Sequence, residues 1–448
     1  MSKKKYRIRW GRVAMLIAAL AAVGIAIYYA VVGIVALFSW LISLIDGMID
    51  SNRNEDSAPQ VVSAYQQMDM TNGMTARIDS FMTLPTRLDK KNIAVEVYDL
   101  TTQQTTYFYQ TRLSLVPASC MKIPTAIAAL KMLGMNHKYK TTLSIKGTVR
   151  NDTLIGSLLF NAEADPVAET LLPLCEKLRA KGIRHVRGQV YVNLALKDRL
   201  LGHPSAKSWD IPYNRTPLLL KGSRFVNSHL LYTLRTAGVT FRKDNSVKPQ
   251  GKYMVIGTME NTLQDAIIPM MRNSSNIRAE AVLFHLDMKH RLAYGQQKWN
   301  IQHASERFWR KMWQNDSVMI RQQYAFKDGS GLSPQNRLTA SSLVYMLRYA
   351  YADKELRHYL INYALATPGG GRRGSMLSRL SQAEYRNRIF CKTGTMTTIG
   401  ASSLAGYMQG SDGHWYAFAI INVDSPVAEA RLFQDRLCKT IMSKKKRR

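Results

Sequence analysis

The sequence predicts an α/β protein of the α+β type: an antiparallel sheet flanked by helices, with a small inserted α/β domain and an N-terminal transmembrane helix. Strand-like runs lie near both ends of the globular part, at 93–109 and 388–423, with helix-like runs between them. Alternating strand and helix patterns at 139–212 indicate the inserted domain. A hydrophobic share of 46% is enough to bury a sizeable core.

The N-terminal segment predicts a membrane anchor. Residues 13–45 are 33 consecutive positions without a charged side chain, and 1–12 carries six Lys and Arg. About 20 apolar residues span a bilayer as a helix, whereas the apolar region of a cleaved signal peptide has about 7–15 residues. Because basic flanks stay in the cytoplasm, we expect one pass through the cytoplasmic (inner) membrane, with the N-terminus inside and the rest in the periplasm or extracytoplasmic space. The polar segment 46–85 is expected to be a stalk or linker.

The globular part is expected to have a first section at 86–138, the inserted domain at 139–212 and a second section at 213–442. The expected strands are 93–100, 107–109, 141–149, 153–160, 188–194, 388–391, 403–408 and 415–423. The expected helices are 118–135, 167–181, 225–237, 262–272, 275–291, 305–313 and 427–442. A basic tail, 443–448, follows the last helix and either binds an anion or is a solvated end.

The charge of the chain predicts a polyanionic partner. Lys and Arg total 62 against 31 Asp and Glu, which gives a net charge of +31. A location outside the cytoplasm argues against nucleic acid. Anionic membrane lipids or acidic wall polymers, bound through a basic surface, are therefore the expected partners.

The cysteines predict neither a metal site nor a redox switch. The chain has four, at 120, 175, 391 and 438, and none forms a C-x-x-C pair. His and Cys show no zinc-ligand spacing, so we expect no metal and no cofactor. Cys120 and Cys391 are expected to be buried, unpaired thiols, with Cys391 on the strand face opposite Lys392.

A candidate nucleophile opens the predicted helix at 118–135. Ser119 and Lys122 are three residues apart and so share a helix face. A serine hydroxyl needs a base to take its proton, and a lysine with a lowered pKa is one solution. The same Ser-x-x-Lys spacing occurs in both basic tails, but only Ser119 begins an apolar helix.

Two further motifs follow in order along the chain. Ser274 and Asn276 form Ser-x-Asn at a predicted helix start, where an N-cap is the alternative interpretation. Lys392, Thr393 and Gly394 form Lys-Thr-Gly on a predicted strand. A lysine there can bind a carboxylate, and the glycine lets a ligand backbone approach closely.

This ordered triplet is the signature of penicillin-binding proteins and serine β-lactamases. The chain resembles the D-alanyl-D-alanine carboxypeptidase and endopeptidase family, the class C low-molecular-mass penicillin-binding proteins. That family fills the gap between the first two motifs with inserted domains, and this chain has 155 residues between Ser119 and Ser274. The blocks at 328–333, 279–280 and 404–407 also resemble it. Ser275 replaces an acidic residue found in many relatives, and the insert is short for the family.

The resemblance implies a penicillin-recognising, β-lactamase-like fold and an acyl-enzyme mechanism. Ser119 would attack the carbonyl between two D-alanines, Lys122 would take its proton, and Ser274 would relay a proton to the leaving amine. Ser119 would also supply one N–H of the oxyanion hole. The implied substrate-binding residues are Asn276 for the backbone, Lys392 and Thr393 for the terminal carboxylate, Gly394, and Thr395 for the second oxyanion N–H.

The implied reaction is carboxypeptidase cleavage of peptidoglycan stem peptides, with β-lactams as covalent inhibitors. Two alternatives stay open. The same site could act as an endopeptidase on peptide cross-links, or the chain could be a non-catalytic, membrane-tethered peptidoglycan-binding scaffold. The joint presence of Ser119, Lys122, Ser274 and Lys392 argues against the scaffold. No motif resembles the deacylation residue of a β-lactamase.

Overall fold

The computed structural model describes residues 73–292, 300–370 and 374–443, all within one compact unit, Val61–Arg448. The expected anchor at 13–45, the basic segment before it and the tail from 444 lie outside the described residues. Within the described part, no helix combines the length and apolar character that a membrane crossing needs.

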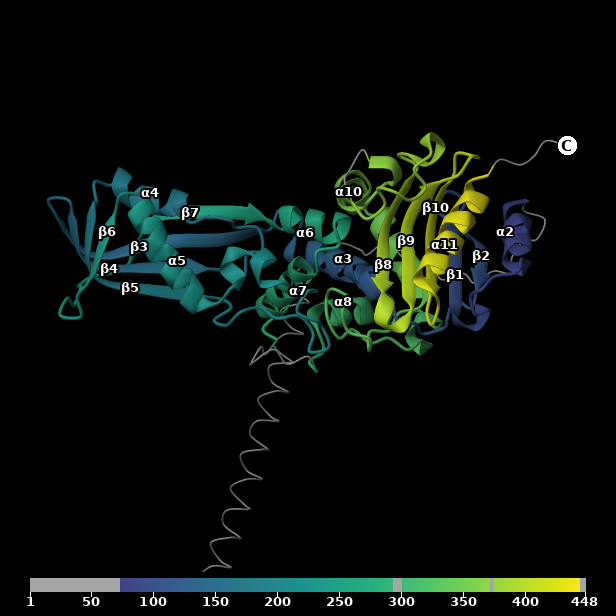
Figure 1. Ribbon diagram of the computed structural model, residues 1–448, viewed down its shortest axis with the longest axis horizontal. Coiled ribbons are helices and arrows are strands. Elements are labelled where there is room, and N and C mark those ends of the chain that lie inside the picture. The colour runs from purple at the N-terminus through teal and green to yellow at the C-terminus, as the bar shows by residue number, and fades with distance from the viewer. Residues whose placement is uncertain (1–72, 293–299, 371–373, 444–448) are drawn as a thin grey trace, which may run out of the picture. The chain divides into compact units, whose positions relative to one another are not determined.

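The first sheet unites the two ends of the globular part, as predicted (Figure 1). Its order is β2-β1-β10-β9-β8, and every pairing is antiparallel. The strands are β1 (Ile93–Asp99), β2 (Gln104–Tyr109), β8 (Ile389–Met396), β9 (Ala401–Gln409) and β10 (Trp415–Asn422). β1 pairs with β10 along its whole length, so the N-terminal and C-terminal strands together form one sheet.

Both faces of this sheet are covered by helices. On one face α11 (Val427–Met442) and α2 (Gly73–Thr83) pack in a shared apolar cluster. The other face packs on α3 (Lys122–Leu133) and α9 (Ala340–Ala352) in a second cluster. The expected stalk at 46–85 is wrong at its C-terminal end, because α2 buries Ile78 completely in the first cluster.

The second sheet forms the inserted domain and is larger than predicted. Its order is β6-β5-β4-β3-β7, with β4–β5 and β5–β6 parallel. The strands are β3 (Lys138–Arg150), β4 (Thr153–Ala162), β5 (His185–Leu194), β6 (Thr240–Lys243) and β7 (Met254–Thr262). Helices α4 (Leu172–Ala180) and α5 (Ser223–Thr236) pack with it in one apolar cluster. The expected limit at residue 212 is therefore wrong, because α5, β6 and β7 complete the same layer.

A helical group lies in sequence between the two sheets. It contains α6 (Leu263–Arg272), α7 (Asn276–Lys289), α8 (Ala304–Met312) and α10 (Lys354–Tyr359). A Thr262 capping box, in which Thr262 and Asp265 cap each other, fixes the start of α6 directly after β7. α7 is buried along most of its length and contacts both α3 and α6. This packing places the start of α7 beside the start of α3, where the sequence motifs meet.

Candidate active site

The candidate nucleophile lies in a tight turn ahead of a helix. Ser119 is in a 3-10 turn, Ala118–Met121, and α3 begins only at Lys122. The preceding residue, Ala118, has φ 45°, a left-handed conformation that is unusual for a residue with a side chain. Gly331 presses against this turn: a Cβ at Gly331 would lie 1.9 Å from the Ala118 carbonyl oxygen. The strained turn is thus held from outside, which is typical of functional sites.

Lys122 is fully buried and directed at Ser119. Its Nζ lies 2.9 Å from Ser119 Oγ, 2.7 Å from Asn276 Oδ1 and 2.6 Å from the Ser330 carbonyl oxygen. The structure therefore brings the first two motifs together around one amine, although they are far apart in the sequence.

The electrostatics of Lys122 favour the neutral amine. Burial, and then the nearby charge of Lys392, hold the pKa of Lys122 well below its ordinary value, while Asp328 and Glu280 oppose the shift. A neutral amine has two N–H groups and one lone pair. If the N–H groups donate to Asn276 Oδ1 and the Ser330 carbonyl, the lone pair is left for the Ser119 hydroxyl proton.

The second and third motifs meet at another buried amine. Lys392 Nζ donates to Ser274 Oγ at 2.9 Å and to the Thr393 carbonyl at 2.7 Å. Lys392 is fully buried, and burial lowers its pKa to about 8. It therefore keeps its charge at neutral pH. Ser274 stands between α6 and α7 with φ 57°, a second strained position at the site.

Strand β8 runs past the nucleophile as an edge strand of the first sheet. A Cβ on Gly394 would lie 2.7 Å from the Pro117 carbonyl oxygen and 3.1 Å from Ser119 N. A glycine is therefore needed for the strand to approach Ser119 this closely. Thr393 and Thr395, on either side of it, are partly exposed.

A buried loop supports the site and was not among the sequence-predicted site residues. Asp328 accepts hydrogen bonds from the backbone N–H of Gly331 and Ser333 and from Asn336 Nδ2. Glu280, on α7, accepts from Ser330 N–H at 3.0 Å, and burial raises its pKa to about 8. These contacts fix the Ser330 carbonyl that Lys122 binds. Only the resemblance of the blocks 328–333 and 279–280 pointed to them.

The prediction that Cys120 and Cys391 are buried, unpaired thiols is confirmed. All four cysteines are buried free thiols. Cys391 packs in the cluster beneath α11, on the strand face opposite Lys392, and Cys120 packs in the other cluster. Burial raises the pKa of Cys391 to about 12, so it stays a thiol at neutral pH.

The site defines a candidate serine hydrolase, in which a serine hydroxyl lies beside a buried amine with a lowered pKa. A family model described as the D-Ala-D-Ala carboxypeptidase 3 (S13) family matches residues 74–217 and 221–438. The chain belongs to this family, which confirms the resemblance seen in its motifs.

The individual relatives match this chain either over a short stretch or at low sequence identity. A D-alanyl-D-alanine carboxypeptidase of an Actinomadura species is 33% identical over 101 residues, which are 22% of this chain and 19% of that protein. Among solved structures, penicillin-binding protein 4 of Haemophilus influenzae is 18% identical, with a TM-score of 0.63, over 83% of this chain and 99% of that one. A predatory endopeptidase of Bdellovibrio bacteriovorus is 15% identical, with a TM-score of 0.52, over 78% and 92%. These two structures share the fold.

Proposed function

We propose that this protein is a serine-type D-Ala-D-Ala carboxypeptidase that cleaves peptidoglycan stem peptides through an acyl-enzyme and is acylated by β-lactams. One observation carries the proposal: the fully buried Lys122 amine lies 2.9 Å from Ser119 Oγ, with two acceptors for its own N–H groups. A scaffold that only binds peptidoglycan needs no such base, so this geometry favours an enzyme. Family membership supports the same conclusion.

The first chemical step transfers the Ser119 proton to Lys122 while Oγ attacks the carbonyl carbon between the two D-alanines. General base catalysis of this kind contributes about 10²–10⁴-fold. The developing oxyanion is held by the backbone N–H groups of Ser119 and Thr395, where one donor is typically worth about 10²–10³ in rate. A proton relayed through Ser274 leaves with the terminal D-alanine, and water then hydrolyses the ester.

Lys392 acts on the substrate carboxylate mainly through its positive charge. Its amine is covered and donates to Ser274 Oγ. The partly exposed Thr393 hydroxyl is the more direct contact for that carboxylate. Asn276 orients Lys122 through Oδ1, and its proposed hold on the substrate backbone uses the amide nitrogen.

Endopeptidase cleavage of cross-links is the second candidate, because the same carbonyl chemistry serves both reactions. Mass analysis of products from purified muropeptides distinguishes them: carboxypeptidase releases free D-alanine, and endopeptidase converts cross-linked dimers to monomers. Ser119→Ala is the matched control and should form neither product. If dimers are cleaved and pentapeptide monomers are left intact, the endopeptidase is the correct assignment. If neither substrate is cleaved by the native protein, the proposed enzyme is wrong.

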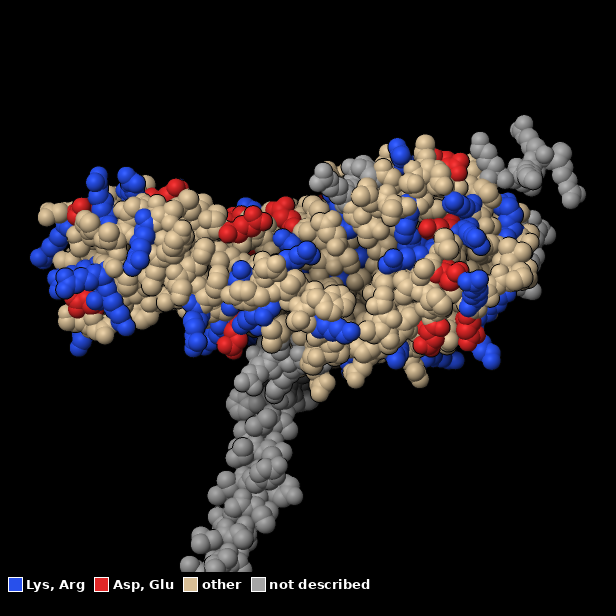
Figure 2. Space-filling model, viewed as in Figure 1, with Lys and Arg blue, Asp and Glu red and all other residues tan. Residues whose placement is uncertain are grey.

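The proposed location is the outer face of the cytoplasmic membrane, supported by the apolar run and its basic flank. Figure 2 shows Lys and Arg side chains distributed over the visible face, with smaller groups of acidic ones. This basic surface suits anionic lipid heads or acidic wall polymers. A tag at Arg448 should be accessible to protease in spheroplasts, and its protection there would contradict the orientation.

A further inference from the structure

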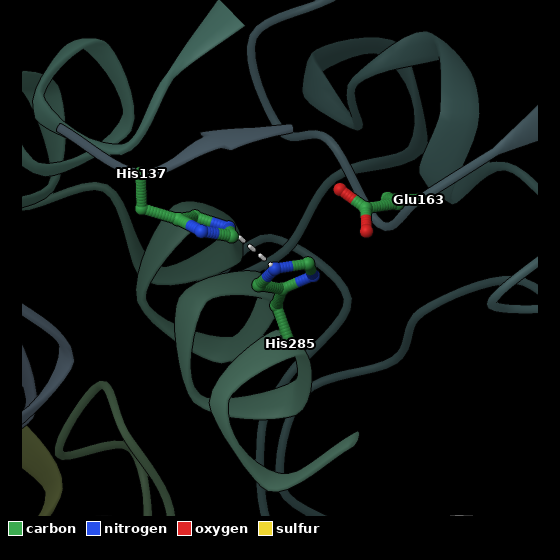
Figure 3. A group of neighbouring side chains, drawn as sticks. All are labelled: His137, Glu163 and His285. Atoms are coloured by element: carbon green, nitrogen blue, oxygen red, sulfur yellow. Dashed lines mark hydrogen bonds between the residues drawn. The ribbon is translucent and has the colours of Figure 1, made fainter. Parts of the chain in front are cut away.

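Three side chains with metal-binding groups converge away from the nucleophile (Figure 3). His137 lies in the turn before β3, Glu163 directly follows β4, and His285 is on α7. One ligand atom from each lies within 4.8 Å of the other two. In Figure 3 the two imidazoles face each other and the carboxylate opens toward them.

The two histidines are unusually close for groups that repel each other when charged. Their Nε2 atoms are 2.8 Å apart, and His285 is almost completely buried. Tyr139 packs against both rings, with centroid distances of 5.6 Å and 4.6 Å.

The backbone around the cluster is firmly held. The carbonyl of His137 accepts from Leu263 N at the start of α6, and Glu163 N donates to the Lys140 carbonyl. The first bond ties the start of β3 to the helical group that includes α6 and α7, and the second ties the end of β4 to β3. An ion there would join the inserted domain to α7, whose first residue, Asn276, binds Lys122.

The donor set matches a transition-metal ion. Two imidazoles and one carboxylate, with a fourth position for water, are ligands that zinc uses in proteins. Tetrahedral zinc with Zn–N of about 2.0–2.1 Å places two ligand nitrogens about 3.3 Å apart. Small movements of His137, which is in a turn and partly exposed, would reach this geometry.

One charge opposes a cation at this position. Lys289 Nζ donates to Glu163 Oε1 at 2.6 Å, and Glu163 Oε2 accepts from Lys140 N. The Lys289 side chain is 43% exposed, so it can turn into solvent when an ion takes its place. Carboxylate oxygens have two lone pairs each, so the bond from Lys140 N can remain.

We propose that His137, Glu163 and His285 form a binding site for a divalent transition-metal ion of the zinc type, which clamps the inserted domain to α7. The ligands come from three separate stretches of chain, which is why the spacing of His and Cys in the sequence did not indicate it. The role is structural, because the cluster is distinct from the group of residues around Ser119.

The test uses the full chain in detergent, purified without a polyhistidine tag and stripped of metal. Equilibrium dialysis against Zn²⁺ should show one ion per chain, and Zn²⁺ should raise Tm. His137→Gln and Glu163→Gln should each weaken zinc binding at least about tenfold and remove the Tm increase. His358→Gln, at an exposed histidine on α10, is the matched control and should bind zinc as the native chain does. Acylation of Ser119 by penicillin confirms that every variant is folded.

Lys289→Gln gives a second test, in which zinc binding should become tighter instead of weaker. Removal of the competing ammonium should tighten zinc binding several-fold while leaving acylation unchanged. The proposal is overturned if the native chain binds no stoichiometric zinc, since the two imidazoles then only share a hydrogen bond. It is also overturned if zinc binds His137→Gln and Glu163→Gln as tightly as the native chain.

Discussion

The two sheets of this protein differ in how they are covered. The first is covered by helices on both faces and, together with them, holds the candidate catalytic lysines, whereas the second leaves one face exposed to solvent. In the first sheet β9 and β10 are buried at nearly every position, because helices cover both faces. In the second sheet β5 alternates buried and exposed residues, because α4 and α5 cover one face only. An amine with a lowered pKa needs the first environment. A broad contact surface for a polymer is compatible with the second.

The buried amines illustrate this contrast. Lys122 and Lys392 are both completely buried between the first sheet and its helices. Lys138, on β3 of the second sheet, is instead exposed and forms an ion pair with Glu260. Such exposed pairs contribute little to stability. If chemistry depends only on the sheet that is covered on both faces, substitutions that slow acylation should be confined to that sheet and the helices packed on it.

The largest effect is expected from loss of the base. Lys122→Met keeps most of the side-chain volume but removes the amine, so acylation by penicillin should slow by about 10²–10⁴-fold. Lys131→Met on the same helix is the control, since Lys131 only pairs with Asp353 near the surface. Stopped-flow or intact-mass kinetics measure both. A Lys122→Met protein that acylates at the native rate would show that another group is the base.

A smaller loss is expected from Lys392→Ala. The attraction between its charge and the substrate carboxylate is taken as about 1.5–3 kcal/mol, the contribution of a hydrogen bond to a charged group, so turnover of stem peptides should fall by about 10–150-fold. A substrate with an amidated C-terminus should lose a similar factor with the native enzyme. The combined change should lose little more than either alone, because both delete the same interaction. If the losses multiply, Lys392 does not act on the carboxylate.

The pH dependence of kcat/KM should report the loss of the positive charge on Lys392. The pKa of Lys392 is about 8, so its positive charge is present below pH 8 and is lost above it. kcat/KM for a free-carboxylate stem peptide should therefore fall above pH 8, by up to about tenfold per pH unit. The amidated substrate, and Lys392→Ala with either substrate, should show no such alkaline decline. On the acid side, the rate should fall where Lys122 becomes protonated.

Sequence patterns predicted much of the fold because its elements are strongly periodic. The helix α11 was expected at its observed bounds, and the predicted pairing of the terminal strands in one sheet is observed. The sequence of α2 predicts a stalk, because its apolar pattern is short and the sheet that buries it is formed by distant parts of the chain. β6 has four residues and three of its positions are exposed, so no apolar run marked it.

The site was predictable in its residue types and less so in its geometry. Ordered motifs identified Ser119, Lys122, Ser274 and Lys392. They did not show that Ser119 lies in a 3-10 turn, which depends on Gly331 packing against Ala118. The Ser330 carbonyl is a backbone group, and such groups have no sequence signal. Glu280 and Asp328 fix it only through tertiary contacts.

The smallest effect on chemistry is expected from the core of the inserted domain. Leu158 on β4 and Leu404 on β9 are both fully buried, so either substitution by alanine should lower the free energy of unfolding by about 2–5 kcal/mol. Leu404 pairs with Thr393 of β8, and its loss should also slow acylation. Leu158 packs in the separate cluster with α4 and α5, so acylation of its folded variant should be unchanged. Denaturant unfolding and penicillin acylation below the transition measure the two quantities. Equal slowing in both variants would mean that the second sheet also positions Ser119.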